Sequence, residues 1–486
     1  MLLPAAAPGA PGKAGKKPVD VHTKSNAAKE RLHPKLQQKV EAGSTARIPV
    51  FVTVRGNPAP TKRLLDGAHV ARAGAASIVV GRIRVQELGK LATTKGVVSV
   101  GPIELRRTGK PLGIPDPEVG QLPDVAEMRD AIEKKKAKEV GHGQSGKLAK
   151  SNFEDLKKLG ILDAKTHDFA EAWREGYTGK GSVGSVLDGG TDWGHPDLIG
   201  TWKTGENGWP EAYDPYGTLL WLVAPDFIDQ GLSWYARTEE KRIERVRRGL
   251  AEVTFATRTG PSRNFDAPDG TVEHTYTFPR SWVRGNRVRM GSHPDDWTLL
   301  IYGERPAFLV VPSNRANRYD EVYVDLDHDF SFADEKPVNR KSPVSYRDMN
   351  GDGYTDLSGG LLYYVSDGET PVPGGLDAFG VEIVPEPGEI LAWNGDFDPA
   401  IGSHGTLTAG NVVGQGVING LAPCFSDLAD APGAEPCDGG GTYPGAVIGG
   451  APHAKLAPMG DIYFSFEFST QLGYFLTNRA GIDVTT

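Results

Sequence analysis

The chain is organised around the segment Gly181-Ser-Val-Gly-Ser-Val-Leu-Asp-Gly-Gly-Thr-Asp-Trp-Gly-His-Pro-Asp-Leu198. Its apolar run 183–187 contains small residues and follows a glycine, which predicts a short, buried strand of a parallel sheet. Asp188 comes at the end of that strand, where open α/β sheets carry their reactive groups. Gly189 and Gly190 then permit a sharp turn. The segment therefore predicts an α/β protein with a functional carboxylate at Asp188.

A second segment, Gly402-Ser-His-Gly-Thr-Leu-Thr-Ala-Gly-Asn-Val-Val-Gly414, predicts a helix that begins at His404 and packs closely through its small residues. Together the two segments resemble the subtilisin-like serine proteases, the subtilases. The Asp motif of that family is V-x-D-[ST]-G followed by H-P-D-L, and its His motif is H-G-T-x-[VT]-A-G. Both occur here in the family's order, although Gly189 stands where the family usually has Thr or Ser. His195, a second histidine, resembles the structural turn of the family.

The resemblance implies a parallel sheet flanked by helices and a serine-type endopeptidase that cleaves protein or peptide substrates. In that mechanism His404 acts as general base and acid, Asp188 orients it, and no cofactor is needed for the chemistry. The nucleophile motif G-T-S-x-A-x-P does not occur in the sequence. We therefore expect the chain to be an inactive fragment, with the Ser and the oxyanion-hole Asn beyond Thr486.

Several other interpretations stay open. The chain could be a non-catalytic subtilase scaffold, or a tripeptidyl-peptidase-like exopeptidase, because its long Asp-to-His insertion resembles the tripeptidyl-peptidase II branch. A metal-dependent hydrolase using His404 and His453 lacks any H-x-x-x-H or H-E-x-x-H spacing. Taken alone, Asp188 would be a turn residue and His404 a polar residue at a helix start.

Composition narrows the functional class. The chain has 486 residues and a net charge of −8, which argues against nucleic-acid binding. It has no apolar run long enough for a transmembrane helix. Its two cysteines, Cys424 and Cys437, predict a disulfide worth about 3 kcal/mol, and hence a secreted or cell-surface protein. Two unrelated thiols are the alternative, and no clear signal peptide is visible at the N-terminus.

The N-terminal part predicts a leader, a small module and a linker. Residues 1–46 are expected to be a disordered leader that ends in a short helix around 27–41. Residues 47–102 predict strands at 48–54, 77–80 and 96–100, with a helix around 85–92. This α/β module resembles a subtilase prodomain, which would make it an internal partner of the protease. Residues 103–150 predict an exposed linker where processing would occur.

The resemblance divides the rest of the chain into a split catalytic domain and an insertion. Residues 151–202 and 391–486 are expected to form the two parts of the catalytic domain, the second including the family-like run Gly450–Leu456. Residues 203–390 are expected to form an inserted β-rich domain. Its predicted strands are 272–278, 297–302, 307–311 and 321–325, and its charged run Thr238–Arg248 predicts a helix.

The insertion also contains a calcium-loop pattern. Oxygen ligands occur at loop positions 1, 3, 5 and 9, with a backbone carbonyl at position 7; the residues are Asp348, Asn350, Asp352, Asp356 and Tyr354. The glutamate expected at position 12 is replaced by Gly359, so Asp325 or Asp327 would have to complete the shell. The pattern predicts a structural calcium site, and a solvated acidic turn is the alternative.

Overall fold

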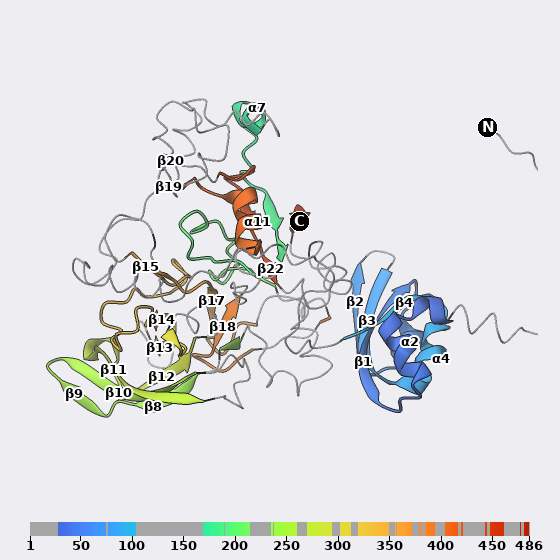
Figure 1. Ribbon diagram of the computed structural model, residues 1–486, viewed down its shortest axis with the longest axis horizontal. Coiled ribbons are helices and arrows are strands. Elements are labelled where there is room, and N and C mark those ends of the chain that lie inside the picture. The colour runs from blue at the N-terminus through green and yellow to red at the C-terminus, as the bar shows by residue number, and fades with distance from the viewer. Residues whose placement is uncertain are drawn as a thin grey trace, which may run out of the picture.

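A computed structural model (Figure 1) describes residues 28–73, 76–103, 169–188, 190–213, 235–236, 238–259, 270–293, 302–312, 319–348, 355, 357–371, 379–380, 384–393, 404–416, 419–420, 443–444, 448–460, 477 and 481–485. The predicted linker apart from Ile103, both cysteines and most of the predicted leader lie outside these residues. Among the described residues, no helix is long and apolar enough to cross a membrane.

The N-terminal module is a four-stranded antiparallel sheet with its helices on one face (Figure 1). Its sheet order is β2-β3-β1-β4. The elements are α2 (Pro34–Glu41), β1 (Arg47–Arg55), α3 (Ala59–Lys62), β2 (Asp66–Ala73), β3 (Ala76–Arg84), η1 (Val85–Glu87), α4 (Leu88–Ala92) and β4 (Val97–Pro102). The three predicted strands and the helix at 85–92 are confirmed.

Alternation of side chains builds the core of this module. Val50, Val52 and Val54 of β1 share one face and pack in one cluster with Leu36 of α2 and Leu91 of α4. The predicted helix at 27–41 is interrupted before Pro34, because a proline at the first helical position starts a new helix. Neither β2 nor α3 was predicted, since the alanine-rich β2 has a low strand propensity and depends on its pairing with β3.

The segments that carry the Asp and His motifs form short parallel strands and a helix. Strand β5 (Val183–Ser185) lies between β21 (Lys455–Leu456) and β23 (Val484–Thr485), and β6 (Leu187–Asp188) pairs with β22 (Met459–Gly460). All three partner strands run parallel to β5 or β6. Helix α7 (Phe169–Arg174) precedes β5, and the helix predicted from His404 onward is present as α11 (His404–Val413). Two further strands, β19 (Asn419–Gly420) and β20 (Tyr443–Pro444), pair with each other.

The described residues between these segments are dominated by antiparallel strands. The strands are β7 (Tyr235–Ala236), β8 (Glu239–Arg242), β9 (Arg245–Arg247), β10 (Leu250–Arg258), β11 (Thr271–Pro279), β12 (Arg287–Ser292), β13 (Ala307–Val311), β14 (Glu321–Val324), β15 (Tyr346–Arg347), β16 (Leu357–Ser358), β17 (Leu362–Val365) and β18 (Ile390–Trp393). A 3-10 turn, η3 (Arg280–Trp282), joins β11 to β12. The predicted strands at 272–278, 307–311 and 321–325 are confirmed; 297–301 lie outside the described residues, and Tyr302 is helical.

Strand β13 lies between two apolar cores. Its Phe308 and Val310 belong to a core that also contains Val186, Trp193 and residues of α11. Its Ala307, Leu309 and Val311 point the other way, into a core shared with β10, β11 and β12. Because successive side chains of a strand face opposite sides, one buried strand connects both cores. The predicted insertion therefore shares its packing with the segment that leads to Asp188 and with α11.

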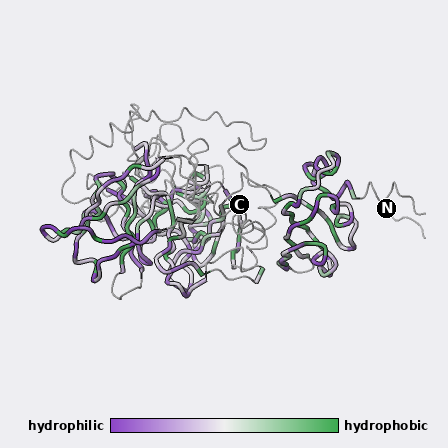
Figure 2. Tube along the Cα trace, turned by 90° about the horizontal axis from the view of Figure 1, so that it is seen from below, coloured by the Kyte–Doolittle hydropathy of each residue, from purple (hydrophilic) through white to green (hydrophobic). Residues whose placement is uncertain are grey.

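The predicted helix Thr238–Arg248 is wrong. The structure has two strands there: β8 pairs with β12, and β9 forms a hairpin with β10. The hairpin turns at Arg248 and Gly249, whose φ angles of 52° and 86° suit a two-residue hairpin turn. Figure 2 shows the hairpin as a hydrophilic loop at the left edge. The dense charge resembled an exposed helix, whereas the hairpin with β10 and the pairing with the distant β12 determined the structure.

Candidate active site

Asp188 is buried at the carboxyl end of β6. Its exposed fraction is 6%, and Val186 and Leu187 before it are buried as well. Its strand pairs in parallel with β22, where Gly460 lies opposite Asp188. A carboxylate in this position is held by the sheet and faces the edge where parallel strands present functional groups.

The first turn of α11 packs against this strand end. A Cβ atom added to Gly405 would overlap the carbonyl oxygen of Gly190 and lie 3.3 Å from Cβ of Asp188. Only glycine permits so close an approach of the helix to the strand. Thr408, on the next turn, donates a hydrogen bond from Oγ1 to Oδ2 of Asp188, at 3.2 Å.

Helix geometry places position 404 on the same face as Thr408. Residues four apart in an α-helix lie one above the other, so the face that Thr408 presents to Asp188 is also the face of position 404. The side chain of His404 lies outside what the structure describes. The hydrogen bond between Asp188 and His404 therefore stays a prediction.

The loop after Asp188 is also fixed to α11. The backbone N–H of Asp192 donates to Oγ1 of Thr406 at 2.9 Å. His195 starts a turn, in which its Nδ1 accepts the N–H of Asp197 at 3.3 Å. Thr406, Thr408 and Asp192 lie within the two motifs, but the motifs alone did not assign them these contacts.

The other predicted site residues are largely outside the described part. Asn350, Asp352, Tyr354 and Asp356 of the calcium-loop pattern lie outside it, as do Cys424 and Cys437. Asp348 is described and is buried, with an exposed fraction of 2%. The calcium site and the disulfide stay predictions.

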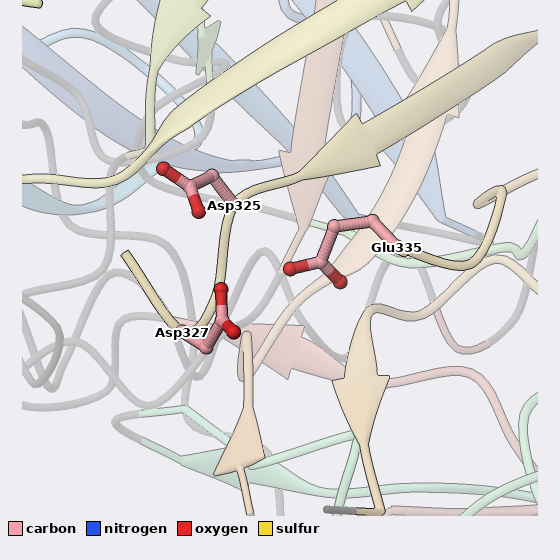
Figure 3. Close-up of side chains that lie close together, drawn as sticks. All are labelled: Asp325, Asp327 and Glu335. Carbon is pink, nitrogen blue, oxygen red and sulfur yellow. The ribbon is translucent and has the colours of Figure 1, made fainter. Parts of the chain in front are cut away.

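Next to Asp348 in the sequence lies Arg347, which belongs to a buried charge cluster. The sequence had singled out Asp325 and Asp327 of this cluster, but not Glu335 or Arg347. Asp325, Asp327 and Glu335 lie close together (Figure 3), with carboxylate oxygens within 4.8 Å of one another. The fully buried guanidinium of Arg347 lies 3.1 Å from Asp327, 3.0 Å from Glu335 and 2.6 Å from Asp334. Burial raises the pKa of Asp325 and of Glu335 well above the usual range, while Arg347 opposes the rise at Glu335.

A second buried network surrounds His293. Its Nε2 lies 2.7 Å from the hydroxyl of Tyr363, which is 2.9 Å from Oγ of Ser345. Complete burial, and then the positive charge of Arg305, lower the pKa of His293 to about 3. The histidine is therefore neutral in the folded protein at physiological pH.

Comparison with known proteins gives one limited similarity. No protein-family model matches the chain, and no solved structure matches it. A stretch of 40 residues, 8% of the chain, is 52% identical to Furin-1 of Xenopus laevis, a subtilisin-like protease, and covers 5% of that protein. The aligned stretch thus spans a small part of the relative's length. Over that stretch, the chain is similar to a protease of the subtilisin type.

Proposed function

We propose that this chain is part of a subtilisin-type serine endopeptidase in which Asp188 and His404 are two members of the catalytic triad. The observation that carries the proposal is the contact between α11 and the end of β6. The backbone of Gly405, directly after His404, packs on Asp188, and Thr408 donates a hydrogen bond to its carboxylate. The similarity to Furin-1 supports the same class.

The proposed chemistry follows from this arrangement. Asp188 accepts a hydrogen bond from Nδ1–H of His404, which leaves Nε2 free to take the proton of a serine hydroxyl. The serine attacks the scissile carbonyl, and the imidazolium then gives its proton to the leaving amine. Asp188 stabilises the imidazolium, and its hydrogen bond from Thr408 helps to keep the carboxylate in one orientation. The G-T-S-x-A-x-P motif that would carry this serine does not occur in the sequence given.

Three related proposals concern the rest of the protein. We propose that residues 47–102 act as a prodomain that blocks the site until the 103–150 linker is cut. We propose a secreted or cell-surface location, because the segment similar to Furin-1 and the predicted disulfide both suit the secretory pathway. We also propose that the Asp348–Asp356 loop holds a structural calcium ion, to which its carboxylates would contribute hard oxygen ligands.

Activity of the full-length protein tests the proposed function. The coding sequence should be read past Thr486, and the protein assayed on fluorogenic peptides and with a serine-directed phosphonate label. Asp188→Asn should lower turnover by about four orders of magnitude, because the imidazole loses the carboxylate that sets its tautomer. Asp367→Asn is the matched control, because the partners of Asp367 in the described structure are Glu369, Thr370 and, at 3.8 Å, Arg340, which all lie outside the two motifs. An Asp188→Asn enzyme that kept most of its activity would overturn the proposal.

A further inference from the structure

The insertion is hydrogen-bonded to the loop that follows Asp188. Oγ1 of Thr355 donates to the carbonyl of Gly194 at 2.9 Å, and the N–H of Trp193 donates to the carbonyl of Gly360 at 3.3 Å. Oγ of Ser358, on β16, donates a short hydrogen bond to Oδ1 of Asp192. Three contacts within so few residues fix the position of this loop relative to β16.

Asp192 is the residue at which three elements meet. Its Oδ1 accepts from Ser358 of the insertion and from the N–H of Gly194, the latter at 3.0 Å. Its own N–H donates to Oγ1 of Thr406 on α11. Thr406 lies two residues after His404, in the first turn of the helix. A continuous chain of hydrogen bonds therefore runs from the insertion to the helix turn that begins with His404.

The direction of the bond from Ser358 is fixed by its surroundings. Its Oγ accepts the N–H of Gly360 at 3.0 Å, so its single proton is directed to Asp192. The packing is also close: a Cβ atom added to Gly194 would lie 2.8 Å from Cβ of Ser358. Trp193, between Asp192 and Gly194, is completely buried in the core that the insertion shares with α11. Ser358 and Asp192 therefore have one well-defined arrangement.

We propose that Ser358 of the insertion is a positioning residue for the candidate active site. Acting through Asp192 and Thr406, it holds the first turn of α11, and with it His404, against Asp188. The inference rests on the proposed pairing of Asp188 with His404. It makes the insertion part of the catalytic framework, and not only an attached domain.

The test follows the imidazole of His404 by NMR in the full chain labelled with ¹⁵N-histidine. The His404 signal is assigned as the one that is missing from the spectrum of His404→Gln. The readout is the rate at which its Nδ1–H proton exchanges with water. Ser358→Ala should make this exchange about three to ten times faster, the factor that corresponds to the loss of one hydrogen bond. Ser358→Thr, which keeps a hydroxyl, should restore slow exchange.

Ser366→Ala is the matched control, because Ser366 is also buried in the insertion but donates its hydroxyl to the carbonyl of Pro385. It should leave the exchange rate unchanged even if it lowers the unfolding midpoint. Thr406→Val interrupts the same chain of hydrogen bonds from the side of the helix. It should reproduce the effect of Ser358→Ala, and it replaces that variant if Ser358→Ala does not fold.

Asp188→Asn distinguishes a failure of the triad proposal from a failure of the positioning role of Ser358. In one outcome, Asp188→Asn changes the His404 signal while the Nδ1–H proton of His404 exchanges at the wild-type rate in Ser358→Ala and Thr406→Val. This result overturns the positioning role and leaves the triad proposal standing. If Asp188→Asn leaves the His404 signal unchanged, the triad proposal fails, and the positioning role fails with it.

Discussion

Thr408 of α11 donates a hydrogen bond to the buried carboxylate of Asp188, across 3.2 Å. The two residues are far apart in sequence, so the bond joins the helix of the His motif to the strand of the Asp motif. Thr408 lies four residues after His404, so both positions are on the same face of α11, and the hydrogen bond shows that this face meets the strand. The carboxylate of Asp188 thus meets the face of α11 on which position 404 also lies.

Close packing at Gly405 gives the first prediction. In Gly405→Ala, the new methyl group would overlap the carbonyl of Gly190, so α11 should move away from β6. Overpacking of this kind costs about 1–3 kcal/mol of unfolding free energy, which urea denaturation can measure. Gly89→Ala in α4 is the matched control, because nothing lies within 4 Å of its new Cβ, and it should be neutral or stabilising. Equal effects of the two substitutions would contradict the contact.

The buried charge cluster gives the second prediction. Arg347→Met leaves Asp327, Asp334 and Glu335 without their shared cation, and removing one partner of a buried ion pair costs about 3–5 kcal/mol. Arg174→Ala, which breaks the exposed pair with Glu171, should cost less than about 0.5 kcal/mol. Chemical denaturation of both variants checks the contrast. A cost for Arg347→Met as small as that for Arg174→Ala would show that the cluster does not need its cation.

The sequence predicted individual strands and helices correctly where a short run of neighbouring residues determined them. Strand β13, an unbroken apolar run at Ala307–Val311, has the predicted bounds, and the helix predicted from His404 onward is present as α11. It failed at Thr238–Arg248, where β8 pairs with the distant strand β12 and β9 forms a tight hairpin with β10. Strand register and sheet partners are tertiary properties, which no local pattern in that charged run specifies.

The candidate site shows the same limit. The motifs pointed to Asp188 and His404, but not to the contacts that Thr408, Thr406 and Asp192 make around them. Arg347 gave no signal in sequence, because an arginine directly before an acidic loop is typical of a surface. Its burial results from carboxylates that the fold collects from separate turns.

The third prediction concerns pH. The pKa of His293 is about 3 in the folded protein and near 6.5 when unfolded, so between these values the unfolded chain binds the extra proton. The free energy of unfolding should therefore fall as the pH drops from about 6.5 towards 3, by up to about 5 kcal/mol from this group. His293→Gln should remove that part of the pH dependence. Parallel pH profiles for wild type and variant, measured by urea unfolding, would contradict the burial of a neutral imidazole.

The fourth prediction concerns the proposed calcium ion. A ligand that binds only the folded state raises Tm, so a chelator should lower Tm and added Ca²⁺ should restore it. Asp352→Asn should abolish the sensitivity to chelator, while Asp367→Asn, outside the loop, should keep it. A Tm that is the same with chelator and with Ca²⁺ would leave the acidic turn as the correct interpretation.

The pairing of Asp188 with His404 can be measured in this chain without the serine. The ¹⁵N signals of the imidazole distinguish its two tautomers at a pH where the ring is neutral. With Asp188 as acceptor, His404 should carry its proton on Nδ1, and Asp188→Asn should move the proton to Nε2, because the new amide can donate to Nδ1. The same tautomer in the wild type and in Asp188→Asn would contradict the triad and reduce Asp188 to a turn residue.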